Sequence, residues 1–95
     1  MFPMKLTIVY TTQIKAALGI GSQQVDLPPP KSTAELLAAI AEKHGPDFRR
    51  LTLDAAGRPL PSVLVCVGDE QIPAGAPLTL RDGDVVTLLG AISGG

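Results

Sequence analysis

The segment 33–44 has the clearest helix signal of this chain, because residues that start and end a helix flank it and its apolar residues recur at helical spacing. Ten glycines and nine prolines divide the 95 residues into short segments, and clusters of these residues mark turns. The uninterrupted stretch 33–44 lies between three prolines at 28–30 and the Gly45-Pro46 pair. Before it, Ser32 and Glu35 have the spacing of a capping box. The chain must therefore fold as short strands around one main helix.

Four segments have the apolar patterns of strands, and a fifth is shorter. The segment 4–10 alternates, with Leu6, Ile8 and Tyr10 on one face. The continuous apolar run 63–67 predicts a strand that is covered on both faces or lies at the centre of a sheet. The remaining strands are expected at 22–27, 71–72 and 85–89, and short helical turns at 14–18 and around Phe48 and Leu51.

One amphipathic helix cannot cover both faces of a four- or five-stranded sheet, so one face should remain open. In the last strand, the period of two places Val86 and Leu88 toward the helix. The same period places Val85, Thr87 and Leu89 on the open face. An open sheet face with apolar side chains is where a partner protein docks.

The composition excludes several functional classes. Eight Lys and Arg against nine Asp and Glu give a net charge of −1, whereas nucleic-acid binding requires a basic surface. No apolar run approaches the roughly 18 residues of a membrane span. One cysteine and one histidine are too few for a disulfide or a structural metal site. We expect a soluble, cytoplasmic, single-domain protein that binds neither nucleic acid nor membrane.

No residue pattern points to an enzyme. Cys66 lies within an apolar strand and is interpreted as a small buried hydrophobe. His44 stands at a helix end without a nucleophile or carboxylate pattern beside it. Asp82 and Asp84 flank Gly83 and are typical of a turn. Without an acid–base pair or a nucleophile triad, we predict a protein that is not a catalyst.

The chain ends in Gly94 and Gly95, which offer no side chain for packing. A frayed end explains such residues, and so does a thin segment that carries a carboxylate into the active site of another protein. The residues therefore predict a folded domain over 1–89 and a flexible tail over 90–95.

The whole pattern resembles the ThiS/MoaD family of ubiquitin-like sulfur carriers, and it is closest to the MoaD-like members. The resemblance rests on the opening segment 5–10, the helix 33–44, the strand 63–67, the Asp-Gly-Asp turn at 82–84 and the terminal Gly-Gly pair. It implies an α+β, ubiquitin-like β-grasp fold, with a mixed four- to five-stranded sheet and one main helix on one face. It also implies that the first and last strands are parallel neighbours.

The resemblance further implies a mechanism. An E1-like adenylyltransferase would activate the Gly95 carboxylate with ATP, and a persulfide donor would convert it to a thiocarboxylate, with Gly94 as a narrow spacer. The carrier itself would bind no cofactor. The sulfur would go to a biosynthetic enzyme, and molybdopterin, cysteine, thiamine, a thiolated tRNA and a secondary metabolite remain open as destinations.

The expected docking surface combines matched family positions with the open face of the last strand. Its members are Thr11, Gln71, Val85, Thr87, Leu89 and, in the tail, Ile92. Of the matched positions Thr11, Gln71 and Leu89, only Leu89 is expected to keep the apolar character of the family. Two alternatives remain: a ubiquitin-like modifier that forms isopeptide bonds through Gly95, and a non-catalytic β-grasp interaction module.

Overall fold

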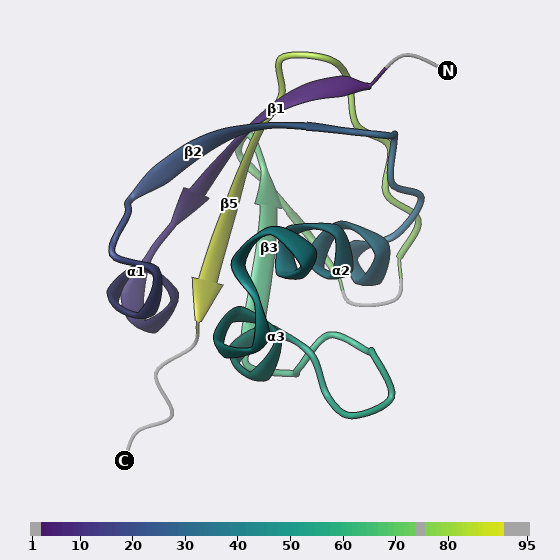
Figure 1. The fold of residues 1–95 in the computed structure, drawn as a ribbon. Helices are drawn as coiled ribbons and strands as arrows, with labels where there is room; N and C mark the ends of the chain where they lie inside the picture. Colours follow the sequence, from purple (N-terminus) through teal and green to yellow (C-terminus); the bar gives the residue numbers. More distant parts are fainter. Residues whose placement is uncertain (1–2, 74–75, 91–95) are drawn as a thin grey trace.

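The computed structural model describes residues 3–73 and 76–90, and Figure 1 shows it as a ribbon. Five strands form one sheet in the order β2-β1-β5-β3-β4. Strands β1 and β5 are parallel, and the other neighbouring pairs are antiparallel. The mixed sheet and the parallel first and last strands are confirmed. The strands are β1 (Met4–Tyr10), β2 (Ser22–Leu27), β3 (Val63–Val67), β4 (Glu70–Ile72) and β5 (Val85–Gly90).

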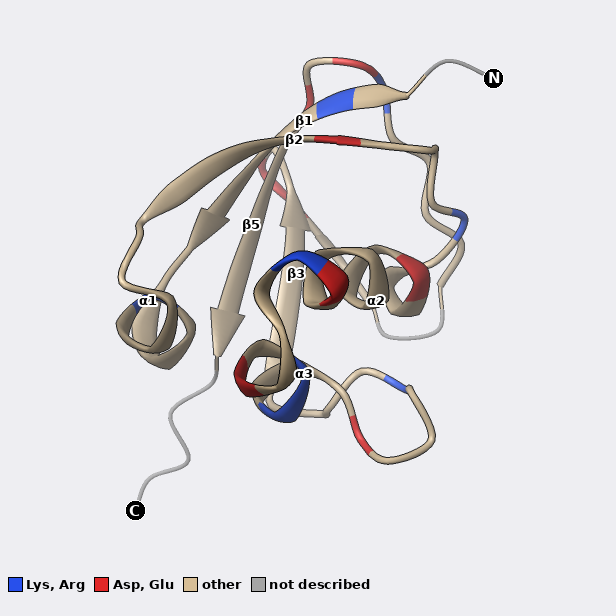
Figure 2. Ribbon diagram, in the orientation of Figure 1, with Lys and Arg blue, Asp and Glu red and all other residues tan. Residues whose placement is uncertain are grey.

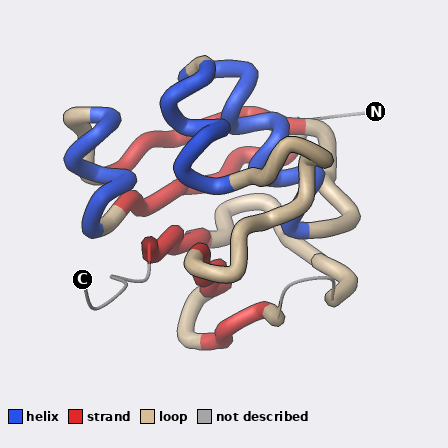
Figure 3. Tube along the Cα trace, turned by 90° about the horizontal axis from the view of Figure 1, so that it is seen from below, coloured by secondary structure: helices blue, strands red, loops and turns tan. Residues whose placement is uncertain are grey.

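Three helices gather on one side of the sheet, as the view along its edge shows (Figure 3). They are α1 (Thr12–Leu18), α2 (Thr33–His44) and α3 (Pro46–Thr52). The main helix α2 is confirmed over the expected residues. The two short helical turns are confirmed as the seven-residue helices α1 and α3.

The start of α2 follows the capping-box prediction with one difference. The Ser32 hydroxyl accepts the N–H of Glu35 at 3.1 Å, as predicted. The Glu35 carboxylate reaches back to the N–H of Lys31, at 3.2 Å, instead of that of Ser32. At the other end, Gly45 adopts φ 91, a conformation that favours glycine, and the chain turns directly into α3.

The core lies between the helices and the side of the sheet that they cover. Leu6 and Ile8 of β1 and Leu36, Leu37 and Ile40 of α2 have no exposed surface. Burial of such aliphatic side chains stabilises a fold by roughly 1.5–3 kcal/mol each. Among the described residues, every buried side-chain nitrogen or oxygen has a hydrogen-bond partner.

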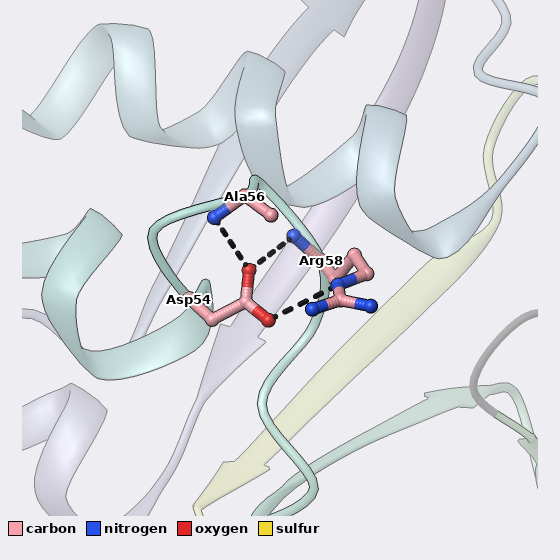
Figure 4. Close-up of polar contacts among 3 residues, drawn as sticks. All are labelled: Asp54, Ala56 and Arg58. Carbon is pink, nitrogen blue, oxygen red and sulfur yellow. Dashed lines mark hydrogen bonds and ion pairs between the residues drawn. The ribbon is translucent and has the colours of Figure 1, made fainter.

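A tight loop follows α3 and is organised by one carboxylate (Figure 4). One oxygen of Asp54 accepts the N–H groups of Ala56 and Arg58, both at 2.9 Å. Its other oxygen lies 3.3 Å from Nε of Arg58. The hydrogen bond from the Arg58 amide is the main cause that lowers the pKa of Asp54. A turn lies at 54–57, where the Gly57 amide donates to the Asp54 carbonyl at 3.0 Å.

Candidate functional site

The central strand β5 separates its residues between the two faces of the sheet. Val86 and Leu88 are fully buried under the helices. Val85 is 43% exposed, and Thr87 and Leu89 are half-buried on the opposite face. The alternation predicted for this strand is confirmed.

The strand register brings the expected open-face residues into neighbouring rows. Thr87 is paired with Cys66 of β3, and Cys66 is paired with Gln71 of β4. Leu89 is paired with Leu64 of β3. Gln71 and Thr87 therefore lie on the same row of the open face, two strands apart.

The sequence reasoning did not assign two apolar members of this face, Leu64 and Cys66, which alternate with buried residues and are half-buried on the open side. Val9 is half-buried as well, on the face that the alternation of 4–10 places opposite Ile8 and Tyr10. The strand predicted at 63–67 is an inner strand of the sheet, between β5 and β4. It is not covered on both faces, because Leu64 and Cys66 are half-buried on the open side. In a continuous apolar run, the period of two carries no visible signal.

Thr11 lies at the end of β1 and is half-buried. Its hydroxyl donates to the Leu88 carbonyl at 2.9 Å, and its amide donates to the same carbonyl at 3.2 Å. Thr11 therefore holds the end of β1 against β5. Its part in a docking surface stays a prediction.

The turn before β5 uses its aspartates to bond the backbone. One oxygen of Asp82 accepts the N–H of Lys5 at 2.7 Å. One oxygen of Asp84 accepts the N–H of Arg81 at 2.8 Å. Figure 2 marks the positions of acidic and basic residues at this turn and on the helices, whereas β3 and β5 contain no charged residue. The middle of the open face is therefore uncharged.

His44 belongs to a polar cluster that joins α2 to the sheet. Its Nε2 lies 2.7 Å from the Gln23 side-chain oxygen and 3.2 Å from the Tyr10 hydroxyl. Tyr10 is 1% exposed, and burial raises its pKa to about 12. The Tyr10 hydroxyl also donates to Gln23 at 3.1 Å. These contacts give His44 a packing role between α2 and β1.

In the part of the chain that spans residues 3–73 and 76–90, no three His, Cys, Asp or Glu residues are placed to hold a metal ion. None of its helices has the length and apolar character needed to cross a membrane. Cys66 is half-buried. A groove of about 320 Å³ lies on the α2 side and is lined by Pro28, Pro29, Pro30, Glu35, Ala38, Ala39 and Glu42.

Gly90 corrects the predicted boundary of the tail. It is the last residue of β5 and is paired with Val63 of β3, so the folded domain extends one residue beyond 89. The other predicted tail residues, Ile92, Gly94 and Gly95 among them, lie outside the described residues.

A mixed five-stranded sheet with parallel first and last strands, covered by helices on one face, defines a ubiquitin-like β-grasp protein. A comparison with protein families matches residues 8–95 to the ThiS family. The chain belongs to the ThiS family, whose members are small carrier proteins rather than catalysts. A comparison with curated proteins finds no match.

Solved structures share this fold at low sequence identity. Small archaeal modifier protein 1 from Methanosarcina acetivorans has a TM-score of 0.78 at 15% identity, over 98% of both chains. A putative molybdopterin converting factor subunit 1 from Pyrococcus furiosus has a TM-score of 0.66 at 18% identity, over 94% of this chain and 99% of that one. CysO from the Amycolatopsis orientalis BexX/CysO complex has a TM-score of 0.65 at 24% identity, over 95% and 99%.

Proposed function

We propose that this protein is a sulfur carrier that receives sulfur on the carboxylate of Gly95. The observation that carries the proposal is the match to the ThiS family, which runs through Gly94 and Gly95. A terminal carboxylate has a pKa of about 3.3–3.7 and is ionised at neutral pH. Because an ionised carboxylate is a poor electrophile, sulfur cannot replace its oxygen until a partner enzyme activates it.

The chemistry requires two partners before the sulfur is delivered. An E1-like adenylyltransferase transfers AMP from ATP to the Gly95 carboxylate and releases pyrophosphate. The sulfur of a persulfide attacks the activated carbonyl and AMP leaves, which forms an acyl disulfide. A second thiol then cleaves the S–S bond and leaves a thiocarboxylate on Gly95. A biosynthetic enzyme accepts this sulfur.

The open sheet face supplies a docking surface for these partners. Val85, Thr87 and Leu89 lie on the strand that leads to the chain end, so a partner that covers them also receives the segment 91–95. Gln71 on β4 and Thr11 after the end of β1 extend the proposed surface on either side of β5, and Ile92 is proposed to join it from the tail. The uncharged middle of this face favours a partner with an apolar contact surface.

The decisive experiment measures the mass of the protein after reaction. Incubation with ATP, a cognate adenylyltransferase, a persulfide source and a reducing thiol should raise the mass by the oxygen-to-sulfur difference. The shift should map to Gly95, and a Cys66→Ser variant should still be alkylated there.

Two altered chain ends serve as controls. Deletion of Gly95 shortens the chain by about 3.3–3.6 Å, and an added residue removes the free carboxylate from Gly95. Both changes should abolish the mass shift and leave thermal stability unchanged. Normal sulfur transfer in either variant would contradict the proposal.

The fold similarity to small archaeal modifier protein 1 favours one alternative, attachment of Gly95 to lysines of other proteins. Both functions need an activated Gly95, so the test must detect the product. A ladder of heavier conjugates on denaturing gels of cell extract would support the modifier. If removal of Gly95 leaves all partner binding unaltered and no sulfur is accepted, the protein is an interaction module. Enzymes that co-purify with the untagged protein would identify the recipient among the pathways left open above.

A further inference from the structure

Gly90 is the last residue of β5, and its backbone N–H and C=O lie on the β1 side of the strand. β1 ends before it reaches Gly90. On the β1 side of β5, the Thr7 amide donates to the Asp84 carbonyl at 3.0 Å, and the Thr11 amide donates to the Leu88 carbonyl at 3.2 Å. Parallel pairing repeats every two residues, so Gly90 faces the same side. β1 ends before Thr11, and no strand residue remains to pair with Gly90 there.

Thr12 takes the place of the missing strand partner. Its hydroxyl oxygen accepts the N–H of Gly90 at 3.1 Å and lies 3.1 Å from the Gly90 carbonyl oxygen. The same hydroxyl lies 2.8 Å from the Thr11 carbonyl oxygen, so its single proton bonds one of the two carbonyls at a time. The hydroxyl therefore accepts from the Gly90 N–H, and it donates either to the Gly90 carbonyl or to the Thr11 carbonyl.

The backbone at both residues fits this contact. Thr12 has φ 53, and in residues 3–73 and 76–90 it is the one non-glycine residue with a positive φ. A β-branched residue rarely adopts this conformation, which persists only where the surroundings hold it. At Gly90, a Cβ would lie 3.2 Å from the Thr12 hydroxyl, closer than ordinary contact. A side chain at Gly90 would press on the hydroxyl that holds it.

We propose that Thr12 is a positioning residue that fixes the end of β5 and thereby sets the length and starting direction of the segment that carries Gly95. Its role in the reaction rests on the proposed sulfur-carrier function. Five residues follow Gly90, and they span at most about 16–18 Å when fully extended. Without the Thr12 hydroxyl, Gly90 joins this segment. A longer segment places the carboxylate at a fixed point less often.

The contact itself is tested by amide hydrogen exchange, measured residue by residue with NMR. Thr12→Val removes the hydroxyl and keeps the β-branched shape. The exchange rate of the Gly90 amide should rise about 2- to 10-fold, which is the factor that corresponds to the net free energy of one hydrogen bond. Thr12→Ser should keep the wild-type rate. Thr11→Val removes a hydroxyl one residue earlier and should leave the Gly90 amide unchanged.

A variant whose residue type suits the backbone at position 12 distinguishes the loss of this contact from a loss of fold stability. Thr12→Gly suits the positive φ and lacks the hydroxyl, so it should fold at least as well as Thr12→Val. Its Gly90 amide should nevertheless exchange as fast as in Thr12→Val. Wild-type exchange of Gly90 in both hydroxyl-free variants would overturn the proposal.

The role in the reaction is tested with the activating enzyme, ATP and the sulfur source. Thr12→Val and Thr12→Gly should lower kcat by about 2- to 10-fold at an unchanged KM, because the docking face is intact while the carboxylate reaches the site less often. Thr12→Ser should restore kcat. Wild-type kcat in the variants with fast Gly90 exchange would overturn the role, as would a loss confined to KM.

The two proposals fail in distinguishable ways. If the wild-type protein accepts no sulfur, the proposed function and the role of Thr12 in it both fail, although the exchange rates still decide whether Thr12 holds Gly90. If the wild type accepts sulfur and the Thr12 variants react equally well, only the positioning role fails.

Discussion

The two faces of β5 carry residues of the same kind in opposite surroundings. Val86 and Leu88 have no exposed surface, whereas Val85 is 43% exposed and Leu89 is half-buried. The helices cover one face only (Figure 3). The comparison teaches that hydrophobicity alone does not assign a residue to the core. On the covered face it stabilises the fold, and on the open face it leaves apolar surface for a partner.

The largest expected effect is the loss of a side chain from the covered face. Leu88→Ala should lower the free energy of unfolding by about 2–5 kcal/mol, as truncation of a buried leucine leaves a cavity. Leu89→Ala, one residue along, should lower it by about 1 kcal/mol or less, because it loses mainly the cross-strand contact with Leu64. Urea denaturation of both variants measures the difference. A larger loss for Leu89→Ala would mean that the register is wrong by one residue.

A second difference between the faces should appear at high pH. Burial raises the pKa of Tyr10 to about 12, whereas an unfolded tyrosine titrates near 10. The folded state therefore holds this proton more tightly, and its stabilising contribution is complete below pH 10 and lost as the pH rises toward 12. The loss is about 2–3 kcal/mol.

The pH dependence is measured as the free energy of unfolding in urea between pH 9 and 12, in wild type and in Tyr10→Phe. In Tyr10→Phe, the free energy of unfolding should not show the decline that tyrosine ionisation causes. The variant also loses the hydrogen bonds to Gln23 and His44, but it loses them at every pH. Parallel curves for the two proteins would show that Tyr10 titrates normally.

The open face should respond in binding more than in stability. Leu89→Ser and Val85→Ser should change the free energy of unfolding by less than about 1 kcal/mol, since both side chains are partly solvated. Each should weaken binding to the activating enzyme. Thr79→Ser, an exposed site outside the open face, is the matched control. Unchanged binding in both variants would place the docking surface elsewhere.

The smallest effect is expected at Asp54, which lies in the loop after α3 and outside β5. Asp54→Ala removes the acceptor of three hydrogen bonds and should lower the melting temperature slightly, with Asp54→Asn between it and wild type. Since hydrogen bonds lower the pKa of Asp54, its contribution is present above the pKa of the unfolded chain. It is lost as the pH falls through the folded pKa. A melting-temperature difference independent of pH would contradict this.

Local pattern predicted the elements of this fold well. The strands at 4–10, 22–27 and 63–67 and the helix 33–44 match the structure, because alternation, capping and helix-ending residues act over a few neighbours. The faces of β5 followed from the same rule. The open-face residues Leu64 and Cys66 could not be assigned, because every position in their strand is apolar.

The sequence by itself determined which segments form strands and helices, and which residues of the alternating strands face the core. Tertiary structure alone decided that β3 lies beside an edge strand, that His44 meets Tyr10 and Gln23, and that Thr12 holds Gly90 across 78 residues. The parallel pairing of β1 and β5 was implied by family resemblance and not by local pattern. Such contacts form when the chain closes long loops to bury apolar surface. The local sequence does not specify which distant residue will be the partner.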